Sequence, residues 1–258
     1  MDGLCVGHGT AIGDDTQMAA QPFLTNLNVQ GFHAGILLND AEGHIHLDRV
    51  NAGHNFYVLY AFFNNGDLAI VHSSLIGNMM AAIACPPSGG CLGGGARIYD
   101  TLLGFQPYGI WGENGGVSGN FLQDVNLIDA RFEAIGCGAI AQGSTLSGQA
   151  QGSYAIKIDH PGFSWNSAEA GSVCSNPNFA IDLDFCGGII IDQGDFPLTP
   201  GPTGPNPAIV KCQGGNAGVW FVYQDGNQAP PATLVAGSSW VVFLSKAIVQ
   251  KVPGGWAQ

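Results

Sequence analysis

Two short runs, Ile45-His46-Leu47-Asp48 and, after a short bend, Phe56-Tyr57-Val58-Leu59-Tyr60, give the clearest indication of the fold. The first run alternates apolar and polar residues, which is typical of a β-strand with one buried face. The second run is apolar at consecutive positions, which indicates a strand that is covered on both faces. The same pair of runs recurs along the chain in the same order.

The recurrence predicts a repetitive β architecture. First runs lie at residues 27–29, 45–48, 68–71, 96–99, 125–128, 156–159, 181–184 and 208–211, and second runs at residues 35–38, 56–60, 81–84, 108–111, 138–141, 171–174, 187–191 and 218–222. Successive first runs are spaced by roughly 18 to 30 residues, as in solenoids with variable loops. We therefore expect an all-β, right-handed parallel β-helix of about eight coils with a short C-terminal β capping segment. A β-sandwich is the alternative, but it gives no reason for the fixed order of the runs.

The phase of the first runs predicts which side chains face the interior. Equivalent positions in neighbouring coils are stacked, so matched apolar residues form ladders. We expect these interior residues to be buried and vertically stacked: Ile45, Leu47, Ile70, Ile98, Leu127, Ile158 and Leu183.

Composition excludes several classes of protein. Hydrophobic residues make up 46% of the 258-residue chain and charged residues only 10%, so the chain can fill a core. The formal net charge of −12 and the absence of a Lys/Arg cluster argue against nucleic acid as a partner. Long apolar runs are absent, so membrane insertion is not expected. The first 13 residues lack the pattern of a Sec signal peptide.

Three segments are expected along the chain. Residues 1–23 form an N-terminal cap or partner-contact segment, and residues 24–227 form the parallel β-helix. Residues 228–258 follow the linker Ala229-Pro230-Pro231 and read as a terminal hairpin or strand pair. A solenoid must shield its last coil, and this segment is placed to do so.

Several stretches resemble a known family. Residues 26–40 (NLNVQGFHAGILLND), 66–78 (GDLAIVHSSLIGN) and 108–114 (YGIWGEN) resemble coils of pectin-lyase-like β-helices, especially those of phage tailspikes and related virion spikes. The likeness covers roughly residues 20–225 and is one of pattern.

The resemblance implies a function and a location. A virion-associated spike subunit would bind host cell-surface polysaccharide, in the virion or outside the cell, with other virion proteins at its N-terminal end. The fold also carries enzymes, so a polysaccharide-degrading hydrolase or lyase is the alternative. No cofactor is expected for either function.

The apolar second runs predict self-association. Residues 56–63, 189–191 and 219–223 are apolar at both alternating positions, so the outer face of the second sheet needs cover. The resemblance to virion spikes makes a parallel homotrimer the expected form. Long loops of the same chain, such as residues 197–207, are the alternative cover.

Aromatic and acidic residues gather in the middle of the stack. Sugars bind such combinations, because rings stack on C–H faces and carboxylates accept hydrogen bonds from hydroxyl groups. The candidate glycan-binding residues are Tyr99, Tyr108, Trp111, Glu113, Asp129 and Glu133. Packing of Tyr108 and Trp111 against loops or a sister chain is the alternative.

Two other groups have the residue types of a catalytic or metal site. Asp182 and Asp184 lie two residues apart on an expected strand, and a carboxylate pair at that separation suits glycosidic-bond cleavage. A solvated edge explains them as well. His44, His46 and Asp48 have the residue types of a metal site, but an outward polar strip also explains them, so no metal is expected.

The seven cysteines contain no CxxC pair, which argues against a zinc site of ordinary spacing. Most are expected to be small buried hydrophobic residues. Cys85 and Cys91 flank Pro-Pro-Ser-Gly-Gly and form a small disulfide loop if the protein works outside a cell.

Overall fold

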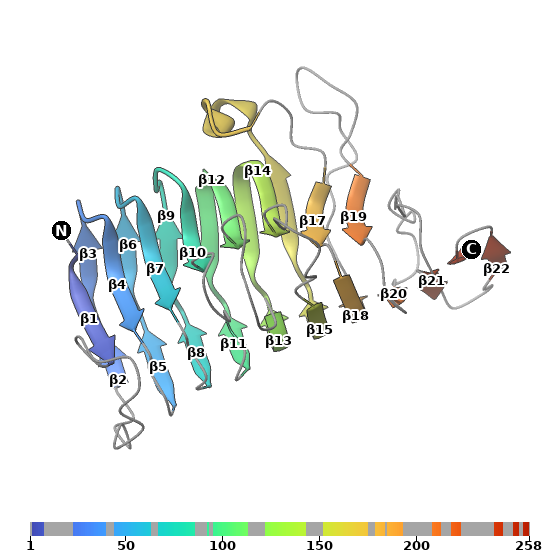
Figure 1. Cartoon of the computed structure of the whole chain (residues 1–258), viewed down its shortest axis with the longest axis horizontal. Helices are drawn as coiled ribbons and strands as arrows, with labels where there is room; N and C mark the ends of the chain where they lie inside the picture. Colours follow the sequence, from blue (N-terminus) through green and yellow to red (C-terminus); the bar gives the residue numbers. More distant parts are fainter. Residues whose placement is uncertain are drawn as a thin grey trace.

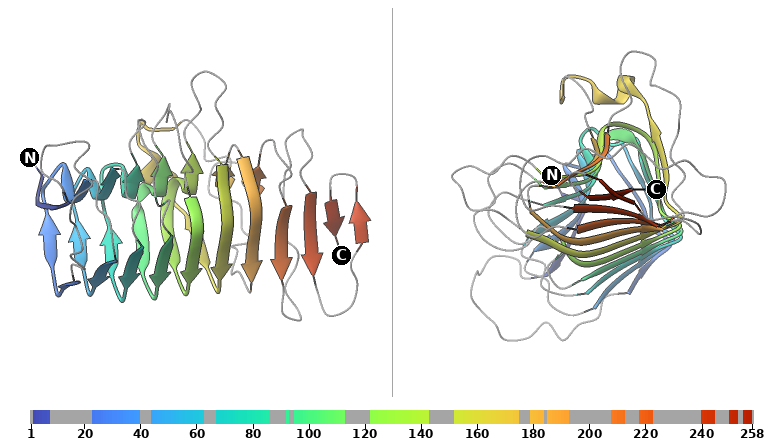
Figure 2. Two further views of the ribbon diagram at one scale, coloured as in Figure 1. Left: turned by 60° about the horizontal axis from the view of Figure 1, so that its bottom comes forward. Right: turned by 90° about the vertical axis from the view of Figure 1, so that its right-hand side faces the viewer.

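A computed structural model describes residues 2–7, 23–39, 44–62, 67–85, 92, 95–112, 122–142, 152–174, 179–183, 185–192, 208–212, 218–222, 240–244, 250–252 and 255–257. The fold is nearly all-β, with parallel sheets, and the strands stand side by side along one long axis (Figure 1). Seen down that axis, successive strands lie behind one another (Figure 2).

Sheet B is an 11-stranded sheet that collects the predicted first runs. Its order is β2 (Phe23–Thr25), β5 (Ile45–Asp48), β8 (Leu68–Val71), β11 (Ala96–Tyr99), β13 (Leu122–Ile128), β15 (Gly152–Asp159), β18 (Phe185–Asp192), β20 (Gly218–Val222), β21 (Trp240–Leu244), β23 (Gly255–Ala257) and β22 (Gln250–Val252). Every neighbouring pair is parallel except β22 with β23. The antiparallel hairpin at the C-terminal end is therefore β22–β23, while β21 continues the parallel sheet.

Sheet A collects the predicted second runs. Its main path is β1 (Leu4–Gly7), β4 (Ala34–Asn39), β7 (Tyr57–Phe62), β10 (Ala81–Cys85), β12 (Leu102–Gly112), β14 (Arg131–Gln142), β17 (Phe179–Leu183) and β19 (Ala208–Cys212), all parallel. The chain visits sheet B and then sheet A in turn, and we call one such round a coil.

A third row of short strands, joined to sheet A through β12 and β14, follows the sheet B strand in the first six coils. It consists of β3 (Asn28–Gln30), β6 (Asn51–Gly53), β9 (Ser74–Ile76), the first residues of β12 and β14, and β16 (Gly162–Trp165). The sequence pattern predicts two strands in each coil, and the third was missed because it is only three or four residues long where it stands alone. This is why residues 27–29, expected in the first sheet, contribute to the third row, while β2 takes the place in sheet B.

Left-handed residues mark both bends of the first five coils. The bend after the sheet B strand carries Asn26, Arg49, His72, Asp100, Asp129 and His160, and the bend before the sheet A strand carries Gly31, His54, Gly77, Phe105 and Ala134, all at positive φ. From Asn26 to Asp129 and from Gly31 to Ala134, the two series advance by the same number of residues at each step. All length variation between these coils therefore falls in the connection from sheet A back to sheet B.

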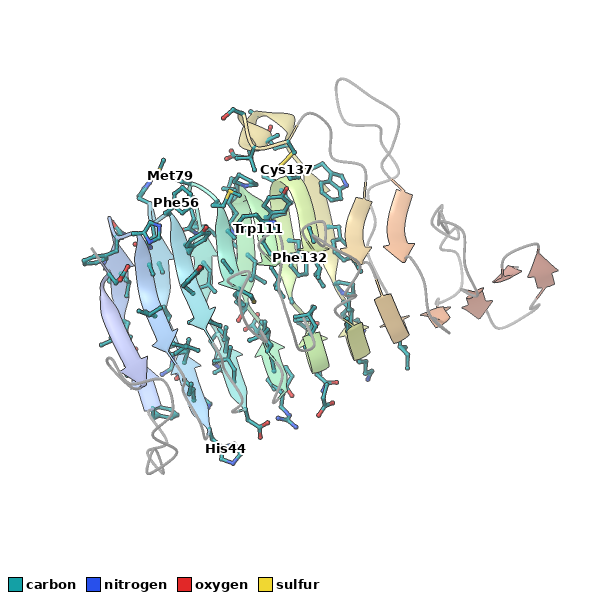
Figure 3. The ribbon with its side chains drawn as sticks, viewed as in Figure 1. His44, Phe56, Met79, Trp111, Phe132 and Cys137 are labelled. Carbon is teal, nitrogen blue, oxygen red and sulfur yellow. A yellow bond between two sulfur atoms is a disulfide. The ribbon has the colours of Figure 1, made fainter. Side chains whose placement is uncertain are left out.

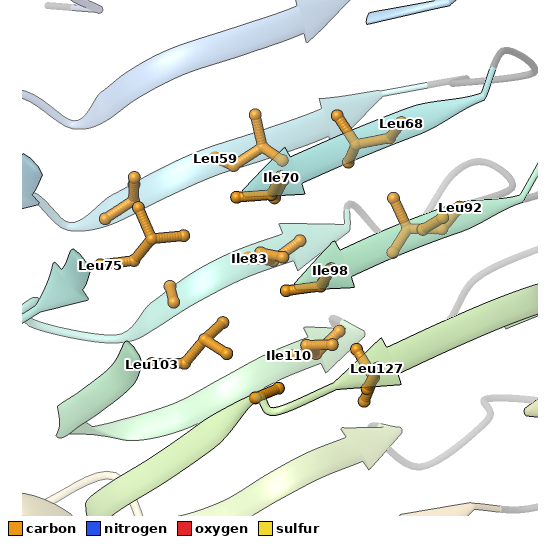
Figure 4. Close-up of a cluster of buried hydrophobic side chains, with 14 of the residues drawn as sticks. Leu59, Leu68, Ile70, Leu75, Ile83, Leu92, Ile98, Leu103, Ile110 and Leu127 are labelled. Atoms are coloured by element: carbon orange, nitrogen blue, oxygen red, sulfur yellow. The ribbon is translucent and has the colours of Figure 1, made fainter. Parts of the chain in front are cut away.

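Stacked aliphatic side chains fill the interior between the sheets (Figure 4). In sheet B, one inner row runs through Leu47, Ile70, Ile98, Leu127 and Ile158, each at most 1% exposed. Six of the seven predicted interior residues, Ile45 with these five, are confirmed as buried and stacked. Burying a side chain of this size stabilises the fold by about 1.5–3 kcal/mol.

The seventh residue, Leu183, lies in a run that was assigned to the wrong sheet. Residues 181–184 and 208–211 were expected in the first sheet, but β17 and β19 pair within sheet A. Residues 187–191 and 218–222 were expected in the second sheet, but β18 and β20 continue sheet B. Alternating apolar residues look the same in both sheets, so the pattern alone did not reveal the shift.

The change of sheet begins in the sixth coil, where residues 166–174 leave the stacked strands; we call this segment the excursion. Residues 171–174, expected to be a strand, follow the 3-10 helix η1 (Ser167–Ala170) in a turn. Asn166 caps η1 by accepting a hydrogen bond from the Ala168 N–H at 3.1 Å. A Cβ on Gly136 would lie 2.2 Å from the Ala170 nitrogen, so this glycine lets the excursion pack directly on β14.

A disulfide fixes the same excursion. Cys137 of β14 is bonded to Cys174, with 6.0 Å between the two Cα atoms. Cys85 is also disulfide-bonded, whereas Cys91, its predicted partner, lies outside the described residues. At least four of the seven cysteines are therefore cross-linked, because Cys85 needs a partner other than Cys137 and Cys174. Cys85 and Cys137 are buried, as expected of most cysteines, but they are disulfide-bonded.

The described part of the chain contains no helix with the length and apolar character needed to cross a lipid bilayer.

Candidate functional site

Four aromatic side chains form a cluster on the outer face of sheet A, which we call the aromatic patch: Tyr57, Tyr60, Tyr108 and Trp111. Tyr57 and Tyr60 come from β7, and Tyr108 and Trp111 come from β12, with β10 between them. Ala81 pairs with both Tyr57 and Tyr108, and Ala84 pairs with both Tyr60 and Trp111. The two small residues leave room for the rings of the outer strands to lean together.

The rings of the aromatic patch contact one another closely. Tyr108 and Trp111 have ring centroids 5.3 Å apart and an interplanar angle of 8°. Tyr57 lies 5.0 Å from Tyr60 and 6.3 Å from Trp111, in both cases with nearly parallel rings. Tyr60, Tyr108 and Trp111 remain half-exposed. The patch is therefore a preformed aromatic surface that retains access to solvent.

An unusual spacing places these rings on one face. Along an ordinary strand, residues two apart share a face, but the patch uses residues three apart in both β7 and β12. The residues in between are turned into the core, including Val58 with Leu59 and Ala82 with Ile83. In β12 the equivalent position is Gly109, where a Cβ would lie 2.6 Å from the Phe132 ring. Two consecutive residues of each strand therefore face the core, and the residues before and after them share the outer face.

The aromatic surface continues toward the bend beside the third row. Phe56 packs edge-on against Tyr57 at 4.7 Å, and His33 stacks on Phe56 at 5.3 Å. Met80 packs against the same cluster. Figure 3 labels Phe56, Met79 and Trp111 along this side of the molecule, with His44 at the opposite end of the strands. A connected series of rings thus crosses the first four coils.

The structure brings together only part of the predicted glycan-binding set. Tyr108 and Trp111 are neighbours, as expected. Tyr99 lies on sheet B, where it pairs with Val71 and Ile128. Asp129 is exposed at the bend after sheet B, and Glu133 lies in the third row opposite Gly104. Glu113 lies outside the described residues.

Sequence reasoning missed Tyr57 and Tyr60. Both fall in the run at residues 56–60, which was interpreted only as an apolar interface strand. The signal was present, because the Tyr57/Tyr60 spacing repeats the Tyr108/Trp111 spacing two coils later. Pairing the coils in register brings the two sets together.

The predicted catalytic candidate Asp182 falls on the same sheet as the aromatic patch. Trp111 pairs with Ala141, Ala141 pairs with Asp182, and Asp182 pairs with Lys211. The row therefore leads from the patch to a carboxylate position and then to an ammonium position. Asp184, the other member of the expected pair, lies outside the described residues.

The outer face of sheet B is polar in the early coils. His44 pairs with Asp67 at 3.0 Å, His72 with Asp48 at 3.1 Å, and Lys157 with Asp159 at 3.3 Å. His46 stacks on the exposed Phe23 with ring centroids 4.4 Å apart. Among the described residues, no group of three or more His, Cys, Asp or Glu side chains is arranged to hold a metal ion.

No family model, curated protein or solved structure matches this chain. The aromatic patch and the row that continues it are therefore the features of the molecule that bear on function.

Proposed function

We propose that the chain is a right-handed parallel β-helix and a virion spike subunit that binds cell-surface polysaccharide through the aromatic patch. The observation that carries the binding proposal is the stacked pair of partly exposed, nearly parallel rings of Tyr108 and Trp111. Aromatic faces stack on the C–H faces of sugar rings, and phenol and indole groups add hydrogen bonds at the ring edges.

Topology supports the β-helix. Consecutive coils add parallel strands to the same sheets in sequence order. Connections between parallel strands of one sheet are right-handed in about 98% of cases, which favours that hand here.

Cross-linked cysteines support a place outside the cytosol. The Cys137–Cys174 disulfide and the disulfide of Cys85 fit an oxidising environment. The assignment to a virion rests on the resemblance of the coils at residues 26–40 and 66–78 to those of tailspikes.

The proposed homotrimer needs a contact face other than the aromatic patch. The apolar runs that predicted a single interface on the second sheet are divided between the sheets, because residues 189–191 and 219–222 belong to sheet B. On its outer face Ile190 is 39% exposed, and Trp220 and Val242 occupy the same row. We place the trimer contact on this row.

A binding experiment tests the proposal. Trp111→Ala should weaken binding to capsular or exopolysaccharide by about 1–3 kcal/mol, the value of one stacked aromatic side chain. Phe23→Ala is the matched control, because Phe23 is also an exposed ring stacked on a neighbour but lies on sheet B. Equal effects of the two substitutions, or no polysaccharide binding by the wild-type protein across a glycan array, would refute the proposal.

A polysaccharide-degrading enzyme is the second candidate function. One observation favours it, namely the position of Asp182 beside Lys211 on the row that begins at Trp111. A carboxylate and an amine next to bound sugar are the residue types of general acid–base chemistry. Release of oligosaccharides from the bound polymer would support cleavage, and retention of intact polymer would support binding alone.

A further inference from the structure

We propose that the Cys137–Cys174 disulfide is a redox latch, which a thiol reductant opens to release the excursion from β14. While the bond is intact, the excursion closes a gap in the pairing of sheet A. When the bond is reduced, the excursion moves away from that gap. The reductant class is a small dithiol or a protein with two neighbouring thiols. The latch is independent of what the aromatic patch binds.

The excursion fills a gap along one edge of β14. On the edge away from β12, β14 pairs with β16 up to Ile135 and, in the described part of the chain, pairs again with β17 only from Ile140. Between these points the excursion takes the place of a strand. The Asn166 N–H donates to the Ile135 carbonyl oxygen at 3.1 Å, and Gly136 lies directly against the backbone of Ala170. Unpaired backbone groups at a sheet edge are a template for another strand, so the excursion covers an edge that would otherwise be open.

Apart from the disulfide, the excursion buries little apolar surface. From Ala168 to Cys174, Ala170 is the only buried residue, and its side chain is a single methyl group. Val173 is 38% exposed, and Gly171 has open space beside its Cα at a φ of +52°. A segment with few buried apolar contacts opens locally at low cost in free energy. The bond to Cys137 is therefore the main restraint that keeps the excursion closed.

The two ends of the excursion are held in different ways. Its N-terminal end follows Trp165, which pairs with Ile135 and packs against the core. Its other end is held by Cys174, whose sulfur is bonded to that of Cys137 beside η1 (Figure 3). Reduction therefore frees one end of the segment, while the anchor at Trp165 keeps it attached to the stack.

Exposure selects the sulfur that a reductant attacks. Cys174 is partly exposed, whereas Cys137 is only 7% exposed. A thiolate of the dithiol attacks Cys174 Sγ and forms a mixed disulfide, and the electron pair of the broken S–S bond goes to Cys137 Sγ, which takes a proton from solvent. The second thiol of the reductant, as its thiolate, then attacks the reductant's own sulfur in the mixed disulfide. This step releases the Cys174 thiolate, which is also protonated, and leaves the reductant as an intramolecular disulfide. Two electrons pass from the dithiol to the protein.

The compartment sets the state of the latch. Disulfides persist outside cells, whereas glutathione and thioredoxin keep thiols reduced in the cytosol. The excursion is therefore closed outside a cell and open in a thiol-rich compartment. In the open state, the edge of β14 at residues 136–139 becomes available for pairing with another strand.

Alkylation of the folded protein tests the latch. The full chain is treated with dithiothreitol and then with iodoacetamide, and peptide mass spectrometry gives the labelling rates at Cys137 and Cys174. If the excursion moves away, Cys137 should be labelled within about threefold of the rate at Cys174, because thiol reactivity follows exposure. Replacing the dithiol by oxidised glutathione should restore the bond and the protection of Cys137. If Cys137 is labelled more than about tenfold more slowly than Cys174, the excursion stays closed after reduction and the latch is wrong.

Cys174→Ser is the matched variant, because it removes the partner of Cys137 without any reductant. Cys137 in this variant should be labelled at about the rate seen in the reduced wild-type protein. Amide hydrogen exchange at Ile98 and Leu127, followed in the same samples, should stay slow. Fast exchange at these two core positions would show that loss of the bond unfolds the stack, and would overturn the latch. A bond that dithiothreitol reduces only in urea would overturn it as well.

Discussion

Gln106 accepts a hydrogen bond from the Asn78 side chain, with 2.6 Å between Asn78 Nδ2 and Gln106 Oε1, one coil further along a buried polar ladder. Asn55 begins the ladder, because its Oδ1 accepts from the Phe32 N–H and its own N–H donates to Asn78 Oδ1. Ile135 takes the next position, opposite Gln106. Within the described residues Gln106 Nε2 has no partner, so the ladder ends there.

Asn78→Ala should destabilise the protein by about 2–4 kcal/mol. The substitution removes the acceptor of the Asn55 N–H and the donor to Gln106, and both partners are buried. Urea unfolding measures the effect. Asn28→Ala is the control, because Asn28 is exposed and its side chain bonds only to that of Gln30 among the described residues. A stability loss equal to that of the control would mean that the ladder contributes nothing.

Gly109→Ala should cost about 1–3 kcal/mol of stability through overpacking. A Cβ at this position would meet the Phe132 ring and the Ala139 carbonyl oxygen at 2.6 Å. Phe132 is fully buried and stacks on Phe163 at 5.3 Å, so it has little room to move. Gly162→Ala is the comparison, since its Cβ would make an ordinary 3.7 Å contact with the Arg131 side chain. Thermal unfolding of the two variants should separate them clearly, and equal melting temperatures would contradict the close packing around Gly109.

Replacing Cys137 and Cys174 together by serine should lower stability by about 3–4 kcal/mol, because the bond closes a loop of 37 residues. The loss should concentrate in the excursion, since the coils have their own core. Hydrogen exchange is expected to accelerate at residues 166–174 and to stay slow at Ile98 and Leu127. Uniform acceleration along the chain would show that the disulfide supports the whole stack instead.

The sequence predicted the strands and their buried faces correctly wherever a residue pattern is compatible with only one position in the fold. Ile45, Leu47, Ile70, Ile98, Leu127 and Ile158 alternate with polar residues, and hydrophobic burial alone places them inside. The second runs at residues 35–38, 81–84 and 138–141 also fell on the expected sheet, sheet A. Parallel pairing of equivalent runs followed from their repeated order.

Strands were assigned to the wrong sheet where the local sequence pattern fits more than one position in the fold. The run at residues 181–184 has the same alternation in either sheet, and only the long-range pairing of Ile140 with Ile181 decides between them. The excursion at residues 166–174 depends on the close approach at Gly136 and on the bond to Cys174, which join distant parts of the chain. The aromatic patch depends on strands in which two consecutive residues face the core, which residue spacing by itself did not reveal for Tyr57 and Tyr60.

Self-association on the outer face of sheet B is the last prediction. From β5 to β15 one outer row carries polar or charged residues at His46, Arg97, Asn126 and Lys157, with Ala69 between the first two. The same row continues through Ile190, Trp220 and Val242, so its character changes to apolar in the last coils. Apolar rows of this kind mark interfaces, and the proposed trimer buries them.

Ile190→Lys should therefore dissociate the trimer, because burying an unpaired ammonium group in an apolar contact costs several kcal/mol. Light scattering at micromolar concentration is expected to give three chains for the wild-type protein and one for the variant. Val71→Lys is the control, since Val71 also lies on the outer face of sheet B but among the early coils, beside Asp48 and Tyr99. A monomeric wild-type protein would refute the trimer. A trimer that dissociates with Val71→Lys and survives Ile190→Lys would move the contact to the early coils.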